Sequence, residues 1–156
     1  DCLFEDVSRD GKSTLKVWNV NAANGVVAAF NVQGAEWSRR LRRFINMPAA
    51  PTTAVDVSPC LVDRPDFQPG GAHELFALQS HRTGSVHAPV RAGETVSHGA
   101  LANGDFDIFV VAPVHTAAVD SLAHADTAAS GVRWAALGLV DMMNGGGAVL
   151  SARTNA

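Results

Sequence analysis

An apolar segment near the C-terminal end of the sequence, residues 132–143, most constrains what this chain can fold into. The run is too short to cross a membrane as a helix, and its β-branched and aromatic residues favour a strand. It breaks at Asn144-Gly145-Gly146-Gly147, where several residues can take a positive φ at little cost, and apolar residues resume at Ala148. We therefore expect residues 132–149 to form the last strand pair of an all-β fold, which closes a core opened by earlier strands.

Shorter apolar segments recur about every 8–14 residues and are separated by Gly, Pro and Asn turn signals, without a regular alternation of strand and helix. This spacing predicts an antiparallel β-sandwich, Greek-key-like, with at most one short helix. Because Val17 and Trp18 point to opposite faces of the first strand, we expect both of its faces to be covered. The expected strands are 14–20, 25–33, 52–58, 74–80, a short one through Val86, 94–100, 105–112 and 114–122.

Residues 36–46 form the one window with a helical pattern. Trp37, Leu41, Phe44 and Ile45 fall at i, i+4, i+7 and i+8, with four arginines between them. The pattern predicts an amphipathic helix, which the Met47-Pro48 sequence would end because proline disfavours helix before it.

Length and composition limit the domain organisation and the partners. At 156 residues the chain is long enough for one domain, and 47% apolar residues exclude disorder. We expect residues 1–13 to be a linker from a preceding region and residues 14–156 to be the β-sandwich domain, because the chain opens without Met or a targeting signal. A net charge of −3 argues against nucleic acid, no segment indicates a membrane, and two cysteines favour a reducing compartment.

Asp105 and Asp107 form the tightest acidic pair. Two strand steps would place them on one face about 6.6 Å apart, close to the roughly 6.5–9.5 Å separation of the carboxylates in inverting glycosidases. They lie beside the Asn103-Gly104 turn and opposite the apolar side chains of Phe106 and Ile108. We therefore favour a solvated sheet edge over a catalytic pair.

The other residue types with catalytic or ligand chemistry lack a matching pattern. The histidines stand singly, without the spacing of a zinc site, which favours surface or loop positions; they are His73, His81, His87, His98, His115 and His124. Ser80-His81 and Ser97-His98 are adjacent in strands and would point to opposite faces. Gly145-Gly146-Gly147 lacks the Lys-Ser/Thr of a phosphate loop and predicts a turn. We therefore expect no catalytic residue, no metal site and no cofactor.

Two groups of side chains could bind a ligand. Four arginines within residues 39–43 could hold a phosphate or a carboxylate, although a solvated or domain-facing basic segment is the simpler interpretation. Trp18, Trp37 and Trp134 could stack on sugar rings, but buried tryptophans are more common, since each adds a large apolar area to a core.

Several separated stretches resemble one family. Residues 10–19 and 25–37 are similar to the region after the catalytic barrel of plant raffinose synthases and seed-imbibition α-galactosidases. Residues 76–84 and 107–114 resemble later strands of that family, and residues 136–149 resemble its C-terminal signature. The matches follow the family's order along nearly the whole chain; residues 39–66 match least.

The resemblance implies the C-terminal β domain of a glycoside hydrolase family 36 enzyme, packed against an upstream (β/α)₈ barrel of the same chain. Such enzymes transfer α-galactosyl from galactinol to sucrose, forming raffinose, or hydrolyse α-galactosides. They use two barrel aspartates, which have no counterpart here, so the resemblance implies no catalytic residue in this segment. With the cysteine usage, it favours the cytoplasm or a plastid over secretion.

Three hypotheses follow. The first is a non-catalytic domain that covers one side of the barrel. The second is a carbohydrate-binding module that uses exposed tryptophans. The third is an independent hydrolase that uses Asp105 and Asp107.

Overall fold

The computed structural model describes residues 7–46, 51–117 and 132–152. No helix in these residues is long and apolar enough to cross a membrane. The strands are β1 (Leu15–Val20), β2 (Gly25–Phe30), β3 (Ala35–Ser38), β4 (Arg43–Asn46), β5 (Thr53–Val57), β6 (Leu75–Ser80), β7 (Val86–Arg91), β8 (Val96–Leu101), β9 (Phe106–Ala117) and β10 (Val132–Ala135). The 3-10 turns are η1 (Pro59–Leu61), η2 (Pro65–Phe67) and η3 (Gly145–Ala148).

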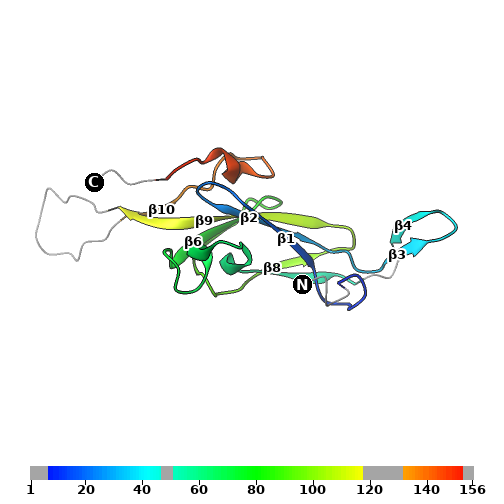
Figure 1. Ribbon diagram of the computed structural model, residues 1–156. Coiled ribbons are helices and arrows are strands. Elements are labelled where there is room, and N and C mark those ends of the chain that lie inside the picture. The colour runs from blue at the N-terminus through cyan, green and yellow to red at the C-terminus, as the bar shows by residue number, and fades with distance from the viewer. Residues whose placement is uncertain (1–6, 47–50, 118–131, 153–156) are drawn as a thin grey trace, which may run out of the picture.

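A central antiparallel sheet organises the fold, with the strand order β1-β2-β9-β6-β7 (Figure 1). The long β9 lies between β2 and β6, so a late strand holds together two earlier parts of the chain. Its far end pairs with β10, in the register Trp134 opposite His115. A second layer, the β5–β8 pair, lies on one side of this sheet, and the C-terminal segment after β10 lies on the other (Figure 1).

The hydrophobic core lies between the central sheet and the β5–β8 layer. Alternate residues of the central strands point into it, as the two-residue period of a strand requires. Phe67 from η2 packs on Phe76 with ring centroids 4.9 Å apart. The core side chains of the central sheet, here called the inner face, are Val27, Ala29, Phe76, Leu78, Phe109 and Val111, and those of the second layer include Val55, Val57 and Leu101.

The predicted all-β sandwich is therefore confirmed, and the expected strands correspond to β1, β2 and β5–β9. The two strands expected over 105–112 and 114–122 are instead one continuous strand, β9, and residues 118–122 lie outside the described ranges. The prediction of a last strand pair over residues 132–149 is only half correct. Residues 132–135 form β10, but the segment resuming at Ala148 belongs to the 3-10 turn η3 and forms no strand. Backbone bonds within the turn, such as Gly147 N–H to Asn144 O at 2.9 Å, replace the expected ladder.

The predicted helix over residues 36–46 is wrong, because this window is the β3–β4 hairpin. Trp37 lies directly opposite Phe44, and the two rings meet edge to face with centroids 5.3 Å apart. Arg42 has φ 49°, a left-handed turn conformation, and Leu41 N–H donates to Ser38 Oγ at 3.2 Å. A cross-strand aromatic pair and a tight turn therefore determine the local structure more strongly than the helical spacing does.

The expectation that β1 is covered on both faces is also wrong. β1 is an edge strand, and Val17, Trp18 and Val20 are all exposed. Lys16 and Trp18 point to the inner side, because they pair with Ala29 and Val27 of β2, but the β5–β8 layer does not reach far enough to cover them. The sandwich is therefore open along this edge.

Candidate functional site

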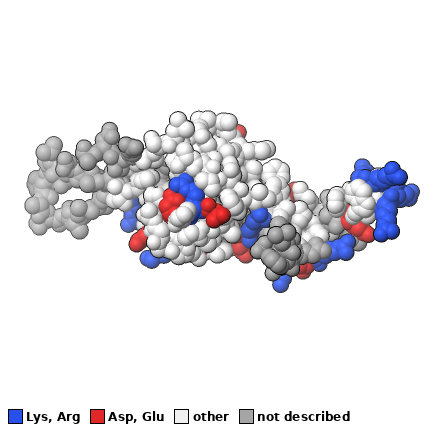
Figure 2. All heavy atoms as spheres, viewed as in Figure 1, with Lys and Arg blue, Asp and Glu red and all other residues white. Residues whose placement is uncertain are grey.

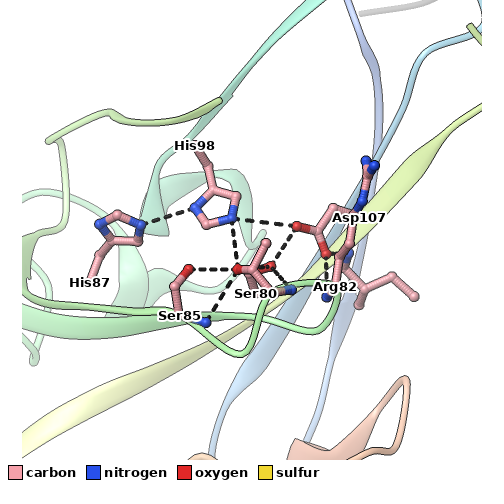
Figure 3. A network of polar contacts seen from close by, with 8 residues as sticks. Ser80, Arg82, Ser85, His87, His98 and Asp107 are labelled. Carbon is pink, nitrogen blue, oxygen red and sulfur yellow. Dashed lines mark hydrogen bonds and ion pairs between the residues drawn. The ribbon is translucent and has the colours of Figure 1, made fainter. Parts of the chain in front are cut away.

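A buried polar cluster centred on Asp107 lies at one end of the inner face (Figure 3). The alternation of β9 places Asp107 on the same side as Phe109, where it is 3% exposed. Its Oδ2 accepts a hydrogen bond from the Ser80 hydroxyl at 2.6 Å, and its Oδ1 accepts from the backbone N–H groups of Arg82 at 3.0 Å and Ile108 at 2.7 Å. The carboxylate is thus satisfied by protein donors on both oxygens.

Two histidines extend this cluster from the neighbouring strands. His98 of β8 has its Nε2 3.6 Å from Asp107 Oδ2 and 3.4 Å from Thr83 Oγ1, while its Nδ1 lies 3.0 Å from His87 Nε2. The His98 ring also meets Phe109 edge to face. Burial lowers the pKa of His98; the Asp107 carboxylate opposes this shift and His87 adds to it. The lowered pKa favours the neutral form of the ring.

Serine, histidine and aspartate are all present, but they are not arranged for nucleophilic catalysis. In that chemistry histidine accepts the proton of the serine hydroxyl and the carboxylate orients the histidine. Here the Ser80 hydroxyl donates to the carboxylate itself, and Ser80 is fully buried. Ser80 Oγ also accepts from Thr83 N–H at 3.1 Å. The cluster holds the turn after β6 against β8 and β9, which is a structural role.

Asp105 and Asp107 have different environments. Asp105 is half-exposed and forms an ion pair with Arg82, with 3.2 Å between Oδ2 and the guanidinium. The solvated-edge interpretation fits Asp105 but is wrong for Asp107, whose carboxylate lies in the core. Although both residues line one recess with His81 and Arg82, the hydrogen bonds of Asp107 leave neither of its oxygens without a donor.

The histidines are also less isolated than expected. His87 pairs with His98, and the His73 and His115 rings meet edge to face at 6.0 Å. The surface interpretation is wrong for His98, whose side chain is 11% exposed, whereas His81 is exposed. His124 lies outside the described residues. Within the described ranges no three His, Cys, Asp or Glu side chains are grouped to hold a metal ion.

The tryptophans do not share one environment. Trp18 and Trp37 are about half exposed, so the buried interpretation is wrong for both, while Trp134 is partly buried and stacks on His115 at 4.7 Å. Trp18 lines a groove of about 830 Å³ beside Lys16, Asp56 and Leu61. Trp37 belongs to the separate β3–β4 hairpin, which projects from the body of the molecule (Figure 1).

The four arginines gather at the tip of that hairpin, where Figure 2 shows a concentration of basic side chains. Arg39, Arg40, Arg42 and Arg43 are all exposed, as predicted for a solvated basic segment. Gly145-Gly146-Gly147 forms the turn η3 and not a phosphate loop, because no helix follows it in the described residues.

The polar cluster was missed because its members are far apart in sequence. Ser80 and Asp107 are 27 positions apart, and His98 comes from a third strand. A signal was nevertheless present, since Asp107 alternates in phase with Phe109 and Val111, and Ser80 with Phe76 and Leu78. A polar residue in phase with the most apolar positions of its strand indicates a buried hydrogen-bonded group.

Comparison with known proteins identifies similar sequences. The family model described as raffinose synthase or seed imbibition protein Sip1 matches residues 1–156. A galactinol–sucrose galactosyltransferase of Oryza sativa subsp. japonica is 39% identical over 153 residues, covering 96% of this chain and 18% of the relative. A probable galactinol–sucrose galactosyltransferase 1 of Arabidopsis thaliana is 31% identical, covering 98% and 19%. A stachyose synthase of Pisum sativum is 25% identical, covering 96% and 17%. The chain thus spans about a fifth of the length of these curated relatives.

Proposed function

The chain belongs to the raffinose synthase and seed imbibition protein family, and from this premise we propose that it is a non-catalytic β domain of a galactosyl-transferring enzyme. In this proposal it packs against a catalytic (β/α)₈ barrel of the same polypeptide, and the barrel acts on galactinol and sucrose, with raffinose as product. The names of the relatives support transfer of the galactosyl group over hydrolysis as the reaction of the parent enzyme.

The environment of Asp107 carries this proposal. Of the tightest acidic pair in the sequence, one carboxylate is buried and bound by three donors, and the other forms an ion pair with Arg82. Galactosyl transfer requires one carboxyl group that exchanges a proton and another that attacks or activates at an open sugar site. A buried carboxylate already bound by structural donors is suited to neither role. That this chain holds no catalytic residue remains a prediction.

A chimera tests the proposal. We would replace the matching segment of the rice relative with residues 1–156 and measure galactosyl transfer from galactinol to sucrose. The chimera is expected to be active, whereas residues 1–156 alone should release no galactose from p-nitrophenyl-α-galactoside. Turnover by the isolated chain above a blank would refute the proposal, and so would an inactive chimera that is folded.

Substitutions at the acidic pair sharpen the test. Asp107→Asn in the chimera should lower the melting temperature, because it weakens a buried hydrogen-bonded group, and activity should follow the folded fraction. Asp105→Asn is the matched control, since it removes only an exposed ion pair of small energetic value. A loss of turnover in folded Asp107→Asn protein at unchanged stability would indicate direct participation in the reaction.

A second candidate function is carbohydrate binding at Trp18. One observation favours it: this half-exposed indole lines the groove of about 830 Å³ together with Lys16 and Asp56. Aromatic faces and a few polar groups are typical of sugar sites, yet Trp37, the other exposed indole, belongs to a different sheet. Calorimetric titration with raffinose would test this candidate, with Trp37→Ala as a control for Trp18→Ala. Binding that survives Trp18→Ala would exclude the groove.

A further inference from the structure

The segment after β10, residues 136–150, displays a concentration of exposed apolar side chains. We call this segment the C-terminal strap. It crosses the outer face of the central sheet, the face opposite the β5–β8 layer (Figure 1). Five of its large apolar side chains are between 53% and 79% exposed: Leu139, Val140, Met142, Met143 and Leu150. Apolar surface concentrated in this way is typical of an interaction site.

The backbone of the strap is fixed in this conformation. Leu139 N–H donates to Gly145 O at 3.1 Å, and Gly145 N–H donates back to Met142 O at 3.1 Å. Gly138 has φ +106°, and a Cβ on it would lie 2.1 Å from Gly145 O, so only glycine fits there. The exposed side chains between these glycines are therefore held outward by a defined loop.

Asparagine amides of the β1–β2 turn hold the strap against the sheet. Asn24, which is fully buried in the β1–β2 turn, donates from Nδ2 to Gly146 O at 3.0 Å. Asn21 Nδ2 bridges Asn24 Oδ1 at 2.9 Å and Asn144 Oδ1 at 2.8 Å. A loop that faces water normally keeps its large apolar side chains inside, whereas those of the strap are exposed. The strap is thus built for contact with another apolar surface.

The surface charge agrees with an apolar partner. The strap carries one charged side chain, the exposed Asp141, whereas basic residues gather at the tip of the β3–β4 hairpin (Figure 2). An apolar patch whose one charge is a carboxylate offers no electrostatic attraction to an anionic membrane or to a nucleic acid. Its complement is the apolar surface of a protein.

We infer that the C-terminal strap is the surface through which this segment docks onto the preceding region of the family polypeptide. The relatives are about five times as long as this chain, so a large region is available to cover the strap within one molecule. In this inference that region is covalently attached, so its effective concentration is high and a contact of modest area suffices. The inference rests on the proposed function and specifies where the contact is made.

The test uses the active rice chimera. Val140→Asp places a carboxylate at a strongly exposed strap position, and we expect a loss of activity of about tenfold or more, because docking would bury an unpaired charge. Val140→Leu should retain activity. Leu41→Asp, at an exposed apolar position on the hairpin, is the matched control and should also retain it. In residues 1–156 alone, Val140→Asp should leave the melting temperature unchanged, which separates docking from folding.

Amide hydrogen exchange gives a second measurement that does not depend on activity. Residues 139–143 should exchange about tenfold or more slowly in the chimera than in residues 1–156 alone, while residues 39–42 should exchange equally in both. Equal exchange of the strap in the two proteins, or full activity of Val140→Asp, would overturn the inference even if the unsubstituted chimera is active. Strap protection that appears in residues 1–156 alone only at high concentration would identify a second copy as the occupant and overturn it as well. An inactive, folded, unsubstituted chimera would instead contradict the proposed function.

Discussion

The two faces of the central sheet are covered by different means. On the inner face, Phe76 and Phe109 pack against a second layer of strands and are fully or almost fully buried. On the outer face, Val110 lies beside the C-terminal strap, whose backbone is held by close glycine contacts and by the Asn24 amide while its largest apolar side chains stay exposed. The inner face from β2 to β6 is thus covered by a second layer of strands, although its β1 edge stays open, whereas the covering of the outer face ends in an apolar surface that lacks a partner in the described structure.

Adjacent residues of β9 give the largest test of this difference, because Phe109 points to the inner face and Val110 to the outer. Phe109→Ala should lower the free energy of unfolding by about 3–5 kcal/mol, the usual cost of deleting a buried aromatic ring. Val110→Ala should cost about 1–2 kcal/mol, since fewer buried atoms are removed. Both values would come from urea unfolding of residues 1–156. Equal costs would show that each atom removed at Val110 is packed more tightly than each atom removed at Phe109, which would contradict the difference between the faces.

Gly138→Ala examines how the strap is held. The added methyl would meet the backbone of Gly145, and alanine disfavours φ +106°. We therefore expect the free energy of unfolding to fall by about 2–3 kcal/mol. The loss should be local: amides of residues 139–146 should exchange faster while those of β6 and β9 change little. Gly84→Ala, with positive φ but open space around its Cβ, is the control for backbone strain alone. If the two variants behave alike, close contact at Gly138 is not what fixes the strap.

Trp134→Ala tests whether the hydrophobic core of the inner face extends to β10. A fully buried tryptophan would cost roughly 3–5 kcal/mol on removal. Trp134 is only partly buried and stacks on His115 at the end of the sheet, so we expect about 1–2 kcal/mol. Thermal unfolding measured by circular dichroism would give this value. A cost near that of Phe109→Ala would extend the inner core to β10.

The sequence predicts the inner face better than the outer one. Runs of apolar residues bounded by turn signals identify β2, β6 and β9, because strands that are covered on both faces carry apolar residues at consecutive positions. The same local logic fails at residues 36–46, where eleven residues fit a helical period although the Trp37–Phe44 pair forms a hairpin.

Long-range contacts explain the remaining differences. The glycines at 145–147 predict a turn, but the strap conformation depends on Asn24, 122 positions away in sequence. Asp107 likewise depends on Ser80 and His98 from other strands, so its burial is visible in the sequence only as a phase shared with Phe109. Alternation thus predicts which residues share a face, while side-chain hydrogen bonds between distant segments require the structure.

The smallest expected effect is a pH dependence of the free energy of unfolding. It should arise from the titratable cluster on the inner face and not from the amides that hold the strap. The lowered pKa of His98 means that the unfolded chain takes up a proton more readily than the folded one. The free energy of unfolding should therefore fall as pH decreases below about 6.5, the ordinary histidine value, and level off below the folded pKa. His115, whose pKa is lowered by burial and by His73, adds to the same pH dependence, so His98→Gln should reduce this slope without abolishing it.

Asp66 does not contribute to the slope in this pH range. Burial would raise the pKa of its carboxyl, but the hydrogen bond and charge of Arg64 lower that pKa overall, so the group stays ionised. Urea unfolding from pH 7 to about pH 5 measures the slope. Over the same range, hydrogen exchange at residues 139–146, corrected for intrinsic rates, should show no opening of the strap, because the asparagine amides that hold it do not titrate. A flat stability profile, or an unchanged slope in His98→Gln, would show that the polar cluster does not hold His98 neutral.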